Sequence, residues 1–90
     1  MHWSIYADLS RGLSAEERSA IAAALNEVVP SGGCVGLQTG GVEEVYFTVE
    51  ADTEAEARAQ AHRDVEVVLR NASVKAEYRV SLQPFRQGKS

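Results

Sequence analysis

The sequence feature that most restricts the fold is a two-residue alternation over residues 44–51. One set of alternate positions is apolar, and the other set is polar or carries a tyrosine. The apolar set is Val45, Phe47, Val49 and Ala51, and the other set is Glu44, Tyr46, Thr48 and Glu50. Successive side chains of a β-strand point to opposite faces, so this pattern predicts a strand that is buried on one face only. Antiparallel sheets commonly leave one face open in this way.

Three other segments are predicted to be strands of the same sheet. Residues 3–9 and 74–83 also alternate between apolar and polar side chains, and Pro84 ends the second segment because it has no N–H to donate. A shorter strand is predicted around Gly36. Paired glycines in residues 39–42 then predict a tight hairpin turn into the next strand.

Two capping boxes mark the starts of two predicted helices. Ser14 with Glu17, and Thr53 with Glu56, have the spacing in which each side chain bonds the other residue's backbone N–H. The Pro-Ser-Gly-Gly sequence of residues 30–33 ends the first helix, and apolar residues spaced by three and four run through both. These stripes are Ile21, Leu25, Val28 and Val29, with Ala22 and Ala24 alongside, and Ala57, Ala61, Val65, Val68, Leu69 and Ala72.

The order of these elements is β-α-β-β-α-β with a hairpin in the middle. This order predicts an α+β protein of the ferredoxin-like class, a four-stranded antiparallel sheet with strand order 4-1-3-2. Right-handed crossovers then place both helices on one face of the sheet. Ninety residues fit one domain, which we predict over residues 1–84, with residues 85–90 as a mobile C-terminal tail.

Cysteine content and apolar runs indicate the compartment. The chain has one cysteine, Cys34, so no internal disulfide can form. The sequence shows no signal-peptide pattern, and no apolar run approaches the roughly 20 residues of a membrane span. We therefore expect a cytoplasmic protein without membrane contact, and we expect Cys34 to be a small packing residue. The net charge of −4 disfavours nucleic acid as a partner.

The sheet face that the helices leave uncovered is the candidate functional surface. Two tyrosines, Tyr6 and Tyr46, are predicted on its adjacent central strands, among charges of both signs. We predict a non-enzymatic interaction module that binds a protein through this face, either a different partner or a second copy in a homodimer. The predicted partner-binding residues are Tyr6, Asp8, Glu44, Tyr46, Thr48, Lys75, Glu77 and Arg79.

The two tyrosines also make the chain resemble RNA-recognition domains, which share this fold and stack bases on aromatic side chains at such positions. The resemblance implies weak binding of single-stranded RNA. However, residues 43–49 place carboxylates on this face and point Phe47 inward. The third strand of that family instead carries a basic residue, glycines and two exposed aromatic residues. RNA binding is therefore an alternative to the leading prediction.

Residues 41–45 and the helix at 54–70 resemble the hairpin and second helix of acylphosphatase, a small hydrolase with this fold. That resemblance implies a phosphate loop after the first strand, where Arg11 and Gly12 stand. It also implies a water-positioning asparagine, whose place Gln38 takes. The Gly-Arg loop motif of the family is missing here, and we do not expect an enzyme.

The loop of Ser10, Arg11 and Gly12 is a candidate anion-binding loop, because backbone amides and a guanidinium meet there before a helix. Regulatory amino-acid-binding domains of the ACT type have the same topology and bind their ligands near this loop. The comparison implies a small-ligand-binding regulator as a further alternative.

No other group of residues predicts a site. His62 and Glu66 lie one helical turn apart, but two ligands do not make a metal centre, and we expect a solvated helix face there. The sequence has no phosphate-loop or dinucleotide-binding motif. We therefore expect no metal and no cofactor.

Overall fold

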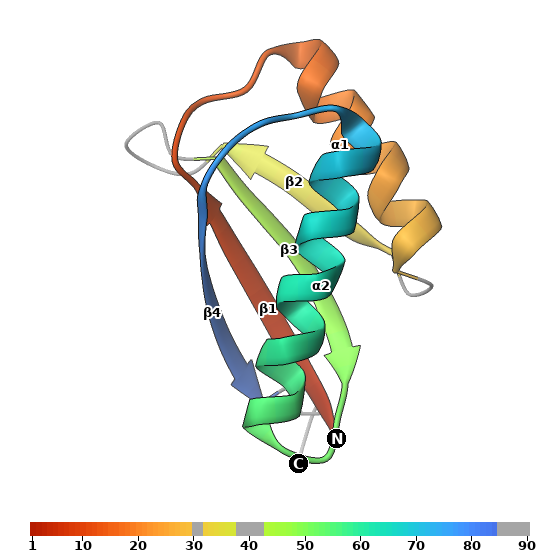
Figure 1. The fold of residues 1–90 in the computed structure, drawn as a ribbon, viewed down its shortest axis with the longest axis vertical. Helices are drawn as coiled ribbons and strands as arrows, with labels where there is room; N and C mark the ends of the chain where they lie inside the picture. Colours follow the sequence, from red (N-terminus) through yellow and green to blue (C-terminus); the bar gives the residue numbers. More distant parts are fainter. Residues whose placement is uncertain (30–31, 38–42, 85–90) are drawn as a thin grey trace.

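A computed structural model describes residues 1–29, 32–37 and 43–84 of the chain. It contains four strands and two helices in the predicted order (Figure 1). They are β1 (His2–Leu9), α1 (Ala15–Val28), β2 (Gly33–Leu37), β3 (Glu43–Glu50), α2 (Glu54–Ala72) and β4 (Tyr78–Pro84). The predicted hairpin turn and the predicted tail lie outside the described residues, and the extent of the domain stays a prediction.

The four strands form one antiparallel sheet in the order β2-β3-β1-β4. This is the predicted order read from the other edge. Both helices lie against the same face of the sheet, and none of the residues that the structure describes forms a helix on the other face (Figure 1). The ferredoxin-like arrangement predicted from the alternation and the capping boxes is therefore confirmed.

The hydrophobic core lies between the sheet and the two helices. The inward residues of the two central strands meet the stripes of both helices, and Ile5, Phe47, Ile21 and Leu25 are fully buried. Burying such side chains is worth roughly 1.5–3 kcal/mol each, which makes this layer the main source of stability. Trp3, the only tryptophan, is buried as well, and its indole N–H donates to the Ala51 carbonyl oxygen at 3.2 Å.

The helix ends follow the sequence signals with one difference. The capping box of Ser14 and Glu17 is complete, as predicted. Thr53 accepts from Glu56 N–H at 3.1 Å, but the Glu56 carboxylate accepts from Asp52 N–H at 3.2 Å, one residue before the cap. At its other end α2 stops at Ser73, whose φ of 58° is left-handed.

The last strand begins four residues later than predicted, at Tyr78 instead of residue 74. Val74 N–H instead donates to the Leu69 carbonyl oxygen at 3.0 Å and completes the end of α2. Lys75 and Glu77, which we predicted on the sheet face, therefore lie in the connection before β4. Val74 and Ala76 alternate with these two residues because their side chains are buried or partly buried in the connection. They are not part of a strand, because β1 ends at Leu9 and offers them no partner.

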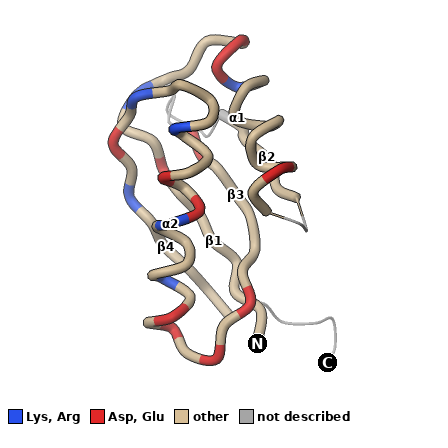
Figure 2. Tube along the Cα trace, turned by 45° about the vertical axis from the view of Figure 1, so that its right-hand side comes forward, with Lys and Arg blue, Asp and Glu red and all other residues tan. Residues whose placement is uncertain are grey.

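Acidic residues gather where β3 passes into α2 (Figure 2). They are Glu50, Asp52, Glu54 and Glu56. The two acidic residues in the first turn of α2, Glu54 and Glu56, stabilise the positive end of its dipole. Neither helix in the described part of the chain is long and apolar enough to cross a membrane.

Candidate functional site

The open sheet face is centred on two tyrosines from neighbouring strands. Tyr6 on β1 stands directly opposite Tyr46 on β3, as the sequence predicted. Their ring centroids are 5.2 Å apart and the ring planes are tilted by 48°. Tilted pairs at this distance are favourable beyond the area that they bury. Both rings are half-buried on a face that the described residues leave without a helix.

The Tyr46 ring is held in place by a hydroxyl contact on the same face. The Ser4 Oγ and the Tyr46 hydroxyl oxygen are 3.3 Å apart, a distance at which either can donate. Ser4 is only 7% exposed although it lies on the helix-free side. Tyr46 is therefore fixed by its neighbours, which lowers the entropy that it would lose on binding a partner.

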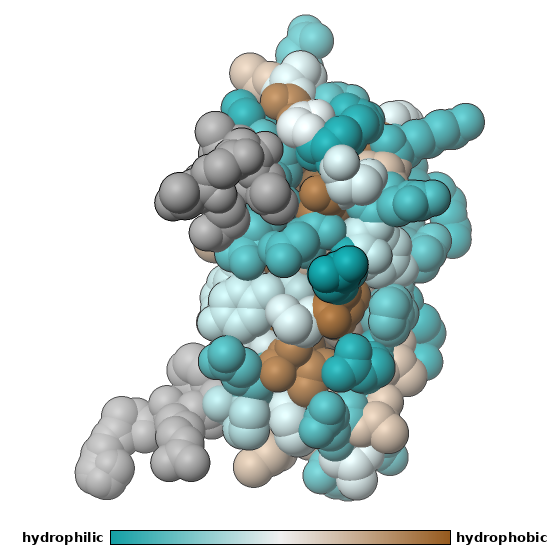
Figure 3. Space-filling model, turned by 90° about the vertical axis from the view of Figure 1, so that its left-hand side faces the viewer, coloured by the Kyte–Doolittle hydropathy of each residue, from teal (hydrophilic) through white to brown (hydrophobic). Residues whose placement is uncertain are grey.

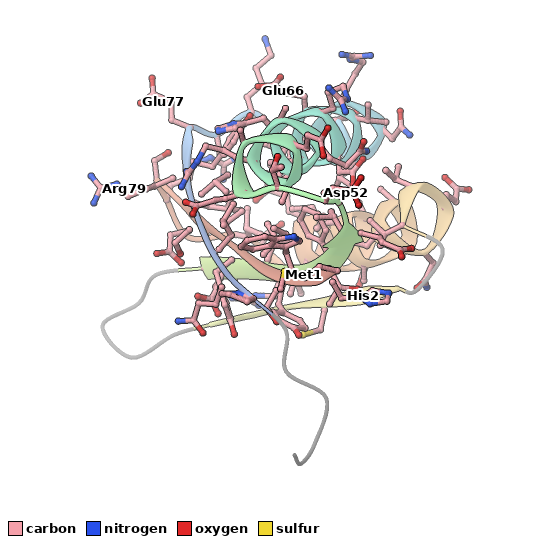
Figure 4. The ribbon with its side chains drawn as sticks, turned by 90° about the horizontal axis from the view of Figure 1, so that it is seen from below. Met1, His2, Asp52, Glu66, Glu77 and Arg79 are labelled. Carbon is pink, nitrogen blue, oxygen red and sulfur yellow. The ribbon has the colours of Figure 1, made fainter. Side chains whose placement is uncertain are left out.

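Carboxylates lie beside the tyrosines at one end of this face. Asp8 stands opposite Glu44 on β3 and opposite Arg79 on β4, whereas Thr48 is opposite Ser4 at the other end. Arg79, like Glu77, points away from the body of the molecule at the β4 margin (Figure 4). The predicted set therefore divides into two groups. Tyr6, Asp8, Glu44, Tyr46, Thr48 and Arg79 lie in the strands of the sheet, and Lys75 and Glu77 lie in the connection before β4.

Cys34 also lies on this face, which corrects the prediction that it packs in the interior. It is exposed and stands opposite Tyr46 in the register of β2 with β3. Val35, the next residue, is the one that packs against the core. Because side chains alternate along a strand, the inward, partly buried Val35 places the Cys34 side chain on the open face.

The candidate anion-binding loop uses its polar groups within the molecule. Arg11 Nη2 lies 2.9 Å from the Glu17 carboxylate, and Arg11 Nε donates to the Lys75 carbonyl oxygen at 3.0 Å. Ser10 Oγ accepts from Glu77 N–H at 3.0 Å. The bonds from Arg11 and from Ser14 N–H lower the pKa of Glu17 to about 2. An anion at this loop stays a prediction, and it would compete with Glu17 for Arg11.

A buried ion pair on the helix side of the sheet was not predicted from the sequence. Glu43 is 0% exposed on the inner face of β3, and Arg18 of α1 donates to it with an Nη2–Oε2 distance of 2.6 Å. Leu13 N–H also donates to this carboxylate, at 3.3 Å. The Arg18 bonds hold the pKa of Glu43 below its ordinary value despite burial. The available signal was the alternation itself, which turns Glu43 inward with Val45.

His62 and Glu66 are brought together by a third residue from β4. The Tyr78 hydroxyl donates to the Glu66 carboxylate at 2.7 Å and lies 3.4 Å from His62 Nδ1. Burial, and then the bond to Glu66, raise the pKa of Tyr78 to about 12. The described residues contain no group of three or more histidine, cysteine, aspartate or glutamate side chains that could hold a metal ion. The trio fastens β4 to α2.

A hollow of about 390 Å³ lies where β1 meets the start of β4, with Asp8, Ser10, Glu77 and Arg79 in its lining. It adjoins the loop at which the ACT comparison places a small ligand. Comparison of the chain with protein families, with curated proteins and with solved structures finds no match.

Proposed function

We propose that this chain is a non-enzymatic protein-binding module that holds its partner on the open sheet face. The observation that carries the proposal is the Tyr6–Tyr46 pair, packed ring to ring in the middle of a helix-free face. Tyrosine is enriched among the few residues that dominate binding energy in protein interfaces. A rigid, half-buried pair of such rings offers contact area at a small entropic cost.

The carboxylates beside the pair favour a partner with a basic side chain. Asp8 and Glu44 stand next to each other on β1 and β3. A lysine or arginine that follows an apolar or aromatic residue in the partner would meet these carboxylates while the apolar group covers the rings. The same carboxylates disfavour RNA, because a phosphate backbone would be repelled where the bases would stack.

Self-association through this same face is the simplest form of the module and stays a prediction. If two copies packed their open faces together with the same strand ends aligned, Asp8 and Glu44 of one copy would lie against Asp8 and Glu44 of the other. Like charges in such an arrangement oppose binding. A different protein with a basic segment avoids this cost whatever its orientation, so we place it first. The lone, exposed Cys34 fits a reducing compartment, which supports action in the cytoplasm.

A displayed random-peptide library selected on the purified chain tests the proposal. We expect enriched peptides to contain a lysine or arginine next to a large apolar residue. The double variant Tyr6→Ala, Tyr46→Ala should weaken their binding at least about tenfold, the scale of one interface hot spot. Asp8→Lys should weaken the binding of basic peptides and leave the binding of neutral peptides unchanged.

Tyr78→Phe is the matched control, because its hydroxyl lies on the helix side and contacts Glu66. Peptides should bind this variant as they bind the unchanged chain. Peptides that bind the Tyr6, Tyr46 double variant equally well, or a selection that enriches none, would contradict the proposal. If the unchanged chain had a mass of twice 9.7 kDa and the double variant had the mass of one chain, self-association through this face would instead be established.

A further inference from the structure

The outer edge of β4 carries backbone groups that the sheet itself does not use. Ser10 N–H donates to the Glu77 carbonyl oxygen at 2.8 Å, and Glu77 N–H donates back to Ser10 Oγ at 3.0 Å. This exchange fixes which residues of β4 bond to β1, because bonded and non-bonded pairs alternate in an antiparallel ladder. Arg79, Ser81 and Gln83 bond to β1. The N–H and C=O groups of Tyr78, Val80 and Leu82 therefore point outward.

Two independent observations agree with this assignment. Ala51 N–H donates to the Met1 carbonyl oxygen at 2.9 Å. The odd-numbered residues of β1 therefore form their backbone hydrogen bonds with β3, and its even-numbered residues form theirs with β4. The Val80 carbonyl oxygen accepts a long bond of 3.5 Å from Arg58 of α2, which an oxygen bonded to β1 could not easily do. No strand of the described sheet lies outside β4.

We propose that β4 pairs with β4 of a second copy of this chain, antiparallel and centred on Val80. In this register Tyr78 stands opposite the second copy's Leu82, and Arg79 stands opposite its Ser81. Aromatic and aliphatic cross-strand pairs are favourable, and no like charges face each other. Figure 3, which faces the β4 side, shows apolar residues along the middle of this edge, between polar ones. Figure 4 shows Arg79 directed away from the body of the molecule.

The neighbouring registers are excluded by particular residues. Centring the pair on Arg79 would set two arginines directly opposite each other, which is destabilising. Centring it on Ser81 or Leu82 would place Pro84 at a bonding position, where it has no N–H to give. The register on Val80 uses Tyr78 to Leu82 of both copies and leaves Pro84 beyond the bonded segment.

This dimer would extend the sheet across a two-fold axis perpendicular to it. Both helical layers would lie on one side, and both Tyr6–Tyr46 pairs on the other. The open faces stay free in this arrangement, so the pairing does not depend on the function proposed above. The long Arg58 bond to Val80 would give way to a backbone bond, which has a shorter and better-aligned geometry.

Opposite substitutions at one exposed residue test the pairing. Ser81→Arg places a second arginine against Arg79 of the other copy, twice per dimer, whereas Ser81→Glu places a carboxylate there. We expect Ser81→Arg to raise the dimer dissociation constant, measured by analytical ultracentrifugation, about two- to thirtyfold. Ser81→Glu should lower it by a similar factor. Arg79→Glu combined with Ser81→Arg should restore tight pairing.

Amide hydrogen exchange gives a direct readout of the edge. As the concentration rises, the Tyr78, Val80 and Leu82 amides should become protected, while those of Arg79 and Ser81 change little. The Tyr6→Ala, Tyr46→Ala variant controls for the open face and should dimerise as the unchanged chain does. A mass of one chain at the highest concentration reached, or equal effects of Ser81→Arg and Ser81→Glu, would overturn the proposal.

Discussion

At the scale of single residues, the Glu43–Arg18 pair shows how strongly one buried charge depends on its partner. Glu43 is fully buried, while the Arg18 side chain is 36% exposed. Arg18→Met should destabilise the fold by about 3–5 kcal/mol, because it leaves an unpaired carboxylate in the interior. Glu43→Gln should cost less, about 2 kcal/mol, because the released guanidinium can turn to water. Urea unfolding of each variant measures the difference.

The double variant Arg18→Met, Glu43→Met is the control for this asymmetry. It removes both charges, so its loss should be smaller than that of Arg18→Met alone. A larger loss in Glu43→Gln than in Arg18→Met would contradict this account of the pair.

Glu17 gives the residue-scale prediction for pH. Its pKa falls from 4.5 to about 2 in the folded chain, mainly through the bond from Arg11. A carboxyl with a lowered folded pKa contributes stability that is present above 4.5 and is lost as the pH falls toward about 2. Arg11→Met should therefore reduce the drop in melting temperature between neutral pH and about pH 2.

The bond from Arg11 to the Lys75 carbonyl is also lost in this variant, but it does not titrate and lowers both melting temperatures alike. Lys75→Met, which keeps the carbonyl, serves as a control for the removal of one positive charge. An unchanged pH response in Arg11→Met would show that Glu17 is not held by Arg11 in solution.

At the scale of elements, two glycines of β2 make a matched pair. A Cβ on Gly33 would collide with the Tyr46 carbonyl oxygen, whereas one on Gly36 would meet nothing within 4 Å. Gly33→Ala should destabilise the fold by about 1–3 kcal/mol, because β2 or β3 must shift. Gly36→Ala should be neutral or stabilise by up to about 1 kcal/mol. Chemical unfolding compares them, and equal losses would contradict the close approach at Gly33.

The elements themselves were largely predictable, because each depends on a local signal. Ser14 with Glu17 starts α1, and the alternation in residues 44–51 describes β3. The start of β4 was not predictable in this way. Val74 and Ala76 alternate with polar residues because they are buried, but whether such a segment pairs depends on where β1 ends, a fact from the other end of the chain.

At the scale of the whole molecule, the acidic balance bears on the RNA alternative. The net charge is −4, and carboxylates lie beside the Tyr6–Tyr46 pair. We expect no salt-sensitive retention of a single-stranded RNA in filter binding, even at low salt. Retention that salt weakens and Tyr46→Ala abolishes would contradict this and restore the resemblance to RNA-recognition domains.

The candidate site was predictable in its centre and not at its margins. Alternation along β1 and β3 places Tyr6 and Tyr46 on one face, and the fold order makes their strands neighbours. The late start of β4 places Lys75 and Glu77 in the connection before that strand, whereas Arg79 lies within β4, opposite Asp8. Arg18 pairs with Glu43 from 25 residues away, and no local sequence pattern indicates this pair.

Trp3 gives the molecule a built-in optical probe. As the only indole in the chain, it is buried and bonded to Ala51, just before α2 begins. Its fluorescence emission should shift to longer wavelength when β1 separates from the segment that leads into α2, because water then reaches the ring. Every unfolding measurement described above can therefore be followed on the unlabelled protein.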